Sequence, residues 1–96
     1  MTDTTELEGK VAIVTGAGQG MGKDASMRLA SSGARVVVND VNAEAVEQTV
    51  ADINNAGGEA IASAGNVTSK TDVDRMVLAA TDTYGCVNIL VNSAGI

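Results

Sequence analysis

Four glycines stand at every second position near the start of the chain: Gly16, Gly18, Gly20 and Gly22. They directly follow the β-branched run Val11–Thr15, which reads as a buried strand, and they open a helix. Gly16 permits a sharp turn, Gly20 lets the backbone approach a pyrophosphate that a Cβ would repel, and Gly22 allows tight helix–sheet packing. The free N–H groups of the first helical turn would then bind the phosphates, so the pattern predicts a dinucleotide-binding turn.

Two other interpretations of this loop are weaker. A P-loop requires Gly, four residues and then Gly-Lys-Ser/Thr, but Ala17 stands at the first glycine position and Asp24 replaces the hydroxyl. A turn whose glycines serve packing alone does not require four of them within seven residues at a strand–helix junction. The loop is therefore interpreted as a phosphate site.

Asp40 ends the second expected strand, 18 residues after Gly22, close to the ~20-residue offset of a ribose-binding carboxylate. Both hydroxyls of an adenosine ribose can donate to it, whereas a 2′-phosphate there would cost about 1–4 kcal/mol at ~4 Å through like charge. Asp40 therefore favours NAD over NADP. The alternative is a turn-initiating Asp before the next helix, but Asn42 already supplies a cap there.

Hydrophobic periodicity predicts four strands that alternate with three helices, a βαβαβαβ order. Helical crossovers of this length join parallel neighbours and, being right-handed, place helices on both faces of the sheet. The expected class is α/β with a parallel sheet in three α/β/α layers. The expected strands are Val11–Thr15, Arg35–Asn39, Glu59–Ala64 and Val87–Val91.

The helices are expected between these strands. The first runs from about Gln19 to Ser32 and ends at Gly33. The second begins after the N-cap Asn42, and the third opens with the Ser69–Asp72 pair, which resembles a capping box. Their apolar stripes are Met21, Ala25 and Leu29 in the first, Val46, Val50 and Ile53 in the second, and Val73, Met76, Val77 and Ala80 in the third.

Composition limits the partners of the chain. Its formal net charge is −6, from six basic and twelve acidic residues without a basic run, so the footprint of a nucleic-acid binder is missing. No apolar stretch approaches the ~20 residues of a membrane span, and the acidic N-terminus is unlike a signal peptide. We expect neither nucleic acid nor membrane as a partner, and a cytoplasmic location.

The chain has no histidine and one cysteine, Cys86. This excludes an intrachain disulfide, a His-based triad and a His-containing metal site within the segment, so no metal is expected. No His or Lys flanks Cys86, which is interpreted as a small buried or half-buried thiol rather than a nucleophile.

Together these residues resemble the short-chain dehydrogenase/reductase family, and the resemblance covers the whole chain. The nucleotide motif of that family, T-G-x-x-x-G-x-G, is matched without a gap by Thr15, Gly16, Gly20 and Gly22. The N-N-A-G motif after the fourth strand stands here as N-S-A-G at residues 92–95. The resemblance implies a Rossmann-type fold with strand order 3-2-1-4.

The family also implies a contact with NAD at each matched position. An acidic residue usually precedes an apolar one after the third strand; here Asn66 replaces it, and its amide oxygen can still accept from the adenine amino group. Ser93 replaces the second Asn of the family motif. We expect this replacement to affect the hydrogen bonds that stabilise the sheet more than cofactor binding. The implied contacts are the pyrophosphate for Gln19, Gly20 and Met21, the adenosine ribose and adenine for Asp40 and Val41, the adenine for Asn66 and Val67, and the nicotinamide ribose for Asn92, Ala94 and Gly95.

The implied activity is hydride transfer between NAD and an alcohol or carbonyl carbon. The catalyst of the family, a Ser with a Tyr and a Lys in Y-x-x-x-K, follows the N-N-A-G motif. Tyr84 has Asn88 four residues later and no Lys follows Lys70, so we expect Tyr84 to be a packing residue. On this interpretation residues 1–96 are the N-terminal part of a longer NAD-binding domain and are inactive alone. The catalytic residues, the substrate pocket and the subunit contacts of a homo-oligomer would lie beyond Ile96.

Two rival hypotheses remain open from the residues. One is a self-standing NAD-binding module without activity, which an in-frame continuation encoding Y-x-x-x-K would exclude. The other is a different Rossmann enzyme, such as a methyltransferase, against which the spacing of the glycine motif and the N-S-A-G tail argue.

Overall fold

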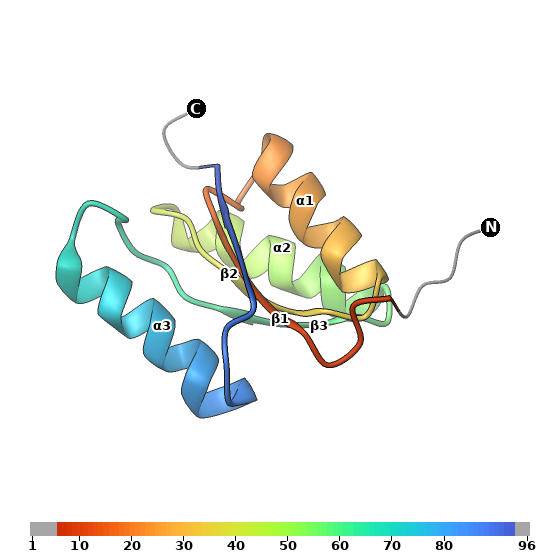
Figure 1. Cartoon of the computed structure of the whole chain (residues 1–96). Helices are drawn as coiled ribbons and strands as arrows, with labels where there is room; N and C mark the ends of the chain where they lie inside the picture. Colours follow the sequence, from red (N-terminus) through yellow and green to blue (C-terminus); the bar gives the residue numbers. More distant parts are fainter. Residues whose placement is uncertain (1–5, 94–96) are drawn as a thin grey trace.

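Strands and helices alternate along the chain, as the periodicity predicts. The computed structural model describes residues 6–93, and its four strands form one sheet of order β3-β2-β1-β4 in which every pairing is parallel. Helices α1 and α2 cover one face of this sheet and α3 covers the other (Figure 1). The expected α/β class and strand order are confirmed. The elements are β1 (Val11–Thr15), α1 (Gly20–Ser31), β2 (Arg35–Val38), α2 (Ala43–Asn55), β3 (Glu59–Ala62), α3 (Lys70–Tyr84) and β4 (Ile89–Asn92).

The register aligns the carboxyl ends of the four strands. Val14 lies opposite Val38 of β2 and Val91 of β4, and Val38 lies opposite Ala62 of β3. Because the strands are parallel, the loops that follow β1, β2 and β3 leave the same edge of the sheet side by side. In open α/β sheets this edge is where ligands bind.

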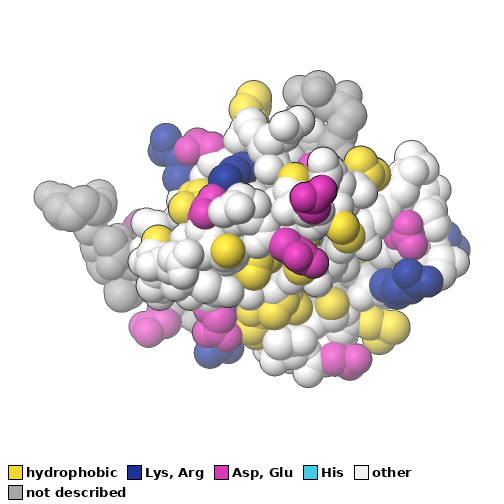
Figure 2. Space-filling model, turned by 180° about the vertical axis from the view of Figure 1, so that it is seen from behind, with side chains coloured by type: hydrophobic (Ala, Val, Ile, Leu, Met, Phe, Trp, Pro, Cys, Tyr) yellow, Lys and Arg dark blue, Asp and Glu magenta, His cyan; other side chains and the backbone are white. Residues whose placement is uncertain are grey.

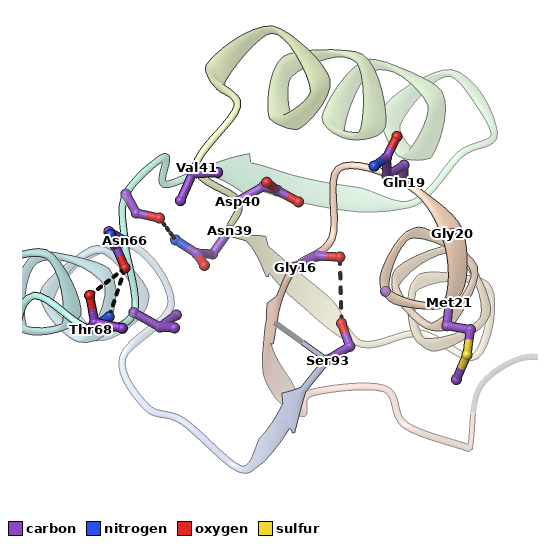
Figure 3. Close-up of a pocket in the computed structure, with 13 residues that line it drawn as sticks. Gly16, Gln19, Gly20, Met21, Asn39, Asp40, Val41, Asn66, Thr68 and Ser93 are labelled. Atoms are coloured by element: carbon purple, nitrogen blue, oxygen red, sulfur yellow. Dashed lines mark hydrogen bonds between the residues drawn. The ribbon is translucent and has the colours of Figure 1, made fainter. Parts of the chain in front are cut away.

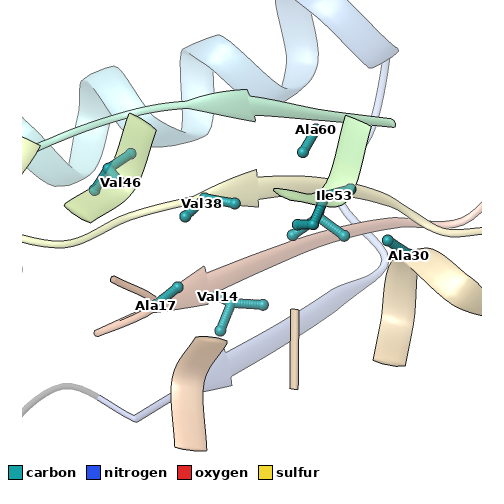
Figure 4. Close-up of a cluster of buried hydrophobic side chains, with 8 residues drawn as sticks. Val14, Ala17, Ala30, Val38, Val46, Ile53 and Ala60 are labelled. Carbon is teal, nitrogen blue, oxygen red and sulfur yellow. The ribbon is translucent and has the colours of Figure 1, made fainter. Parts of the chain in front are cut away.

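Aliphatic side chains form a core on each face of the sheet. On the α1/α2 face, Val14, Val38, Val46 and Ile53 are at most 1% exposed, and the small Ala30 lets α1 approach them (Figure 4). Each fully buried Val or Ile stabilises the fold by about 1.5–3 kcal/mol relative to an exposed one. The cluster on the α3 face consists of Val11, Ile13, Val37, Met76 and Ala80.

The buried stripe of α1 is one residue away from the expected one. Met21 is 73% exposed, and the residues that face the sheet are Gly22, Ser26 and Ala30. A larger residue at position 22 would collide with the loop that precedes the helix, so the smallest side chains face inward. The hydroxyl of buried Ser26 is satisfied because it donates to the carbonyl oxygen of Gly22 at 2.9 Å.

The other helices follow their expected stripes with local changes. In α2, Val46 and Ile53 are buried as expected. Val50 is only half-buried, and Thr49 takes the buried position between them. In α3, Met76 is buried, whereas Val77 remains 42% exposed. The strand bounds also move: β2 ends at Val38 and β3 at Ala62, earlier than expected, while β4 covers Ile89–Asn92 rather than Val87–Val91.

The charged side chains are spread over the surface. On the face seen from behind in Figure 2, Lys and Arg side chains lie apart from one another among carboxylates. Every helix within residues 6–93 falls short of the length and apolar character that a membrane crossing requires.

Candidate functional site

A cavity of about 600 Å³ opens at the carboxyl edge of the sheet. Its walls come from the loop after β1, the first turn of α1, the loops after β2 and β3, and the end of β4 (Figure 3). Sequence-predicted residues make up most of the lining. The lining residues are Gly16, Gln19, Gly20, Met21, Gly22, Asn39, Asp40, Val41, Gly65, Asn66, Val67, Thr68 and Ser93.

The N-terminus of α1 meets this cavity without a cap from its own side chains. Gln19, at the N-cap position, makes no side-chain capping bond, and the first turn carries no acidic residue. In contrast, Asn42 caps α2 by accepting from the Ala45 N–H, and Ser69 caps α3 by accepting from the Asp72 N–H. The first N–H groups of a helix carry partial positive charge, so the uncapped end of α1 can accept an anion.

The glycines of the loop have different surroundings. Gly20 has φ +61°, and a Cβ built on it would meet no protein atom within 4 Å, which leaves open space beside the backbone. At Gly22 a Cβ would overlap the carbonyl oxygen of Gly16 and lie 2.5 Å from Ser93 Oγ. Gly18, predicted as a binding residue, does not line the cavity: a Cβ there would lie 2.7 Å from that of Ala45. Gly20 thus has room for a ligand, whereas Gly18 and Gly22 are required by packing.

Asp40 lies between the glycine loop and the start of α2. Its Oδ2 accepts a hydrogen bond from the Gly18 N–H at 3.0 Å, and its Oδ1 accepts from the Asn42 N–H at 3.3 Å. These bonds hold the half-buried carboxylate at the cavity wall and leave it further acceptor capacity. Val41, the next residue, is 71% exposed and lines the same cavity.

Buried Asn39 joins the loop after β3 to the end of β2. Its Nδ2 donates to the carbonyl oxygens of Ser63 at 2.8 Å and Gly65 at 3.3 Å, and the Gly65 N–H donates to the Asp40 carbonyl oxygen at 3.0 Å. These bonds bring the loop that carries Asn66 directly beside Asp40. Within that loop, Asn66 Oδ1 accepts from both the N–H and the hydroxyl of Thr68 (Figure 3).

The end of β4 is tied to the glycine loop. Asn92 does not line the cavity; its Oδ1 accepts from the Thr15 hydroxyl at 2.9 Å. Ser93 does line it, and its hydroxyl donates to the carbonyl oxygens of Thr15 and Gly16. The predicted contacts Ala94 and Gly95 lie outside the described residues.

Ionic contacts brace the helices that surround the cavity. Lys23 of α1 forms a salt bridge of 2.7 Å with Asp52 of α2. The hydrogen bond from Lys23, with a second from Gln48, lowers the pKa of the Asp52 carboxyl below its usual value. Within residues 6–93, no three Cys, Asp or Glu side chains gather as they would around a metal ion.

A glycine-rich strand-to-helix loop and a carboxylate that follows β2 lie around one cavity. Comparison with known proteins identifies the family of the chain. The sequence pattern of the short chain dehydrogenases matches residues 10–96. The chain belongs to this family. Among its relatives, 7alpha-hydroxysteroid dehydrogenase of Escherichia coli (strain K12) is 43% identical over 94 residues, which is 98% of this chain and 37% of that protein.

Solved structures and shorter proteins agree with this assignment. The crystal structure of a hydroxysteroid dehydrogenase from Escherichia coli superimposes with a TM-score of 0.93 at 42% identity and covers all of this chain and 41% of that one. The Bacillus subtilis (strain 168) protein named short-chain dehydrogenase/reductase homolog YusS is 48% identical over 88 residues, 91% of this chain and 81% of that protein. The chain therefore spans little more than a third of the length of some relatives and most of the length of another.

Four lining residues of this cavity were not predicted as contacts: Asn39, Gly65, Thr68 and Ser93. Local sequence could have indicated two of them. Asn39 directly follows a strand, and Thr68 lies two residues after Asn66; short polar side chains at such positions form hydrogen bonds in turns. Tyr84 ends α3 far from this site, at the amino edge of the sheet. Its ring packs under the guanidinium of Arg35, 5.6 Å from the ring centroid, and burial raises the pKa of its hydroxyl.

Proposed function

We propose that this chain binds NAD in the cavity at the carboxyl edge of the sheet, as part of an NAD-dependent alcohol dehydrogenase or carbonyl reductase. The observation that carries the proposal is the uncapped N-terminus of α1 at the cavity wall, with Asp40 beside it. Met21 and Gln19 border the same opening. The backbone of the first turn, next to the open space at Gly20, would hold the pyrophosphate.

Asp40 would hold the adenosine ribose. Its carboxylate keeps lone pairs for two ribose hydroxyls while the Gly18 N–H fixes its orientation. A 2′-phosphate at this position would meet like charge, and no Lys or Arg within residues 6–93 lines the cavity. NAD is therefore proposed as the cofactor, with NADP disfavoured.

The remaining contacts extend to both ends of the dinucleotide. Val41 and Val67, both in the cavity wall, would flank the adenine. Asn92, Ala94 and Gly95 would lie beside the nicotinamide ribose, in keeping with the family resemblance. When bound, NAD supplies the hydride acceptor or, once reduced, the hydride donor.

The chemistry of the whole protein is proposed from its family. The substrate would be a small alcohol or carbonyl compound, and the acid/base residues would come from outside residues 1–96, because this sequence contains no Y-x-x-x-K. We further propose that residues 1–96 alone bind the dinucleotide without turning over substrate, and that the whole protein is a cytoplasmic homo-oligomer. Membership of the family leaves the methyltransferase alternative without support.

Fluorescence titration tests the cofactor proposal. The chain has no Trp, so the emission of reduced nicotinamide can be followed without a tryptophan background. We expect NADH to bind at least about fivefold more tightly than NADPH, and Asp40→Asn to remove most of this difference. The Asn variant keeps an acceptor for the Gly18 N–H, so the loop stays in place. An unchanged NADH preference in Asp40→Asn would remove Asp40 from the ribose.

A self-standing NAD-binding module is the second candidate. The chain spans 81% of the Bacillus subtilis relative, so a family member of similar length exists. The intact mass of the native protein distinguishes the two candidates, because only a longer protein can supply the missing Tyr and Lys.

A further inference from the structure

The side chain of Asn66 has already used its acceptor capacity inside its own loop. Oδ1 accepts from the Thr68 N–H at 2.9 Å and from the Thr68 hydroxyl at 2.8 Å. An amide oxygen has two lone pairs, so both are engaged. The orientation of the amide follows from chemistry, because a backbone N–H can only donate and must therefore face the oxygen.

The hydrogen-bonding capacity that Asn66 has left is that of its Nδ2, which can only donate. Nδ2 carries two hydrogens, and no residue within 6–93 accepts a hydrogen bond from it. Asn66 is exposed and lines the cavity. A ligand beside this side chain therefore meets N–H groups where a carboxylate would present only acceptors.

The loop lies where the base of a bound dinucleotide belongs, an argument that rests on the proposed function. The Gly65 N–H donates to the carbonyl oxygen of Asp40, and Asn39 holds the same loop through two further bonds. A base attached to a ribose at Asp40 is therefore next to Asn66 and Val67. Figure 3 shows Asp40, Val41 and Asn66 around the same opening.

We infer that Asn66 makes this site tolerant of a 6-oxo purine in place of adenine. Adenine presents an amino donor at its 6-position and acceptors at its ring nitrogens, whereas hypoxanthine presents an oxygen acceptor at the 6-position. A side chain that offers only donors can bond the 6-oxygen of hypoxanthine or a ring nitrogen of adenine, but not the adenine amino group. The site consequently discriminates weakly between the two bases.

Asn66→Asp is a matched variant of the same shape. One carboxylate oxygen can keep both hydrogen bonds from Thr68, and the other replaces Nδ2 with an acceptor. That acceptor favours the amino group of adenine and repels the 6-oxygen of hypoxanthine. The variant thus reverses the polarity at this one position with little change in volume.

The test compares dissociation constants for NADH and for the reduced hypoxanthine analogue of NADH by fluorescence titration. For the unmodified chain we expect the two constants to agree within about fivefold, and for Asn66→Asp we expect the preference for adenine to rise by at least about fivefold. A larger preference for adenine in the unmodified chain, or a smaller rise in a folded variant, overturns the inference. The first comparison needs no variant and decides the matter even if Asn66→Asp does not fold. Failure of both dinucleotides to bind would instead refute the proposed function on which the inference rests.

Discussion

Gly20 and Gly57 share a left-handed backbone but differ in what lies beyond it. Their φ angles are +61° and +92°, and a Cβ on either would meet no protein atom within 4 Å. Only Gly20 borders the cavity at the carboxyl edge of the sheet. Position 20 therefore opens onto the space proposed for the ligand, whereas the exposed Gly57 follows α2 at a different part of the surface.

This pair gives a prediction at the residue scale. Gly20→Ala and Gly57→Ala should each lower the free energy of unfolding by about 1–2 kcal/mol, because alanine is strained at positive φ. Gly20→Ala should also weaken NADH binding at least about tenfold, since its methyl group occupies the space proposed for the pyrophosphate. Urea unfolding and NADH titration measure the two effects. Equal NADH affinities in the two variants would mean that the loop has only a structural role.

Among the helices, α1 has an N-terminus that its own sequence leaves uncapped. Gln19→Asp should supply the missing acceptor and raise the free energy of unfolding by about 0.5–1 kcal/mol, because a carboxylate also interacts favourably with the helix dipole. The same carboxylate would compete with the pyrophosphate, so NADH affinity should fall at least about tenfold. Stability and binding should therefore change in opposite directions.

The control at this scale is Gln19→Ala. It removes a side chain that makes no capping bond but keeps the backbone through which the pyrophosphate contact is proposed, so the stability and the NADH affinity should both stay close to those of the unmodified chain. Thermal unfolding measures the stability, and NADH titration the affinity, of the unmodified chain, Gln19→Asp and Gln19→Ala. If Gln19→Asp bound NADH normally, the phosphates could not lie at the N-terminus of α1.

For the whole molecule, β4 and β3 are the two edge strands of the sheet formed by residues 6–93, and β4 is the apolar one. It pairs with β1 on one side, and within the described residues no strand pairs with its other side. Leu90, opposite Ile13 in the register, is 65% exposed, and residues 86–93 carry no charge. An uncharged apolar edge strand favours pairing with another chain.

We therefore predict that a chain of residues 1–96 self-associates. Leu90→Lys should shift it toward the monomer, because a charge on an edge strand opposes strand pairing. The stability should change little, since the side chain is already exposed. Sedimentation velocity over a concentration series measures the association. An unmodified chain that remains a monomer throughout would contradict the prediction.

Much of this architecture was predictable from local sequence. The β-branched runs and helical periodicities are local patterns, and the parallel sheet follows from helical crossovers between strands. The position of Asp40 at the cavity also follows, because the carboxyl ends of neighbouring parallel strands meet at one edge. Local sequence patterns were therefore enough to predict the class of fold and the loops that form the candidate site.

Which side chains face inward, and which atoms remain available for a ligand, depends on contacts that form only in the folded chain. Polarity patterns favoured Met21 for the buried face of α1, but close contact with the Gly16 carbonyl selected Gly22 by size. Gly18 resembled a binding residue, yet it lies against Ala45 and donates to Asp40. The oxygen of Asn66 is engaged by Thr68, so only its donors remain. Steric fit and hydrogen-bond saturation depend on atoms brought together by folding, and a pattern of residue types along the chain does not contain them.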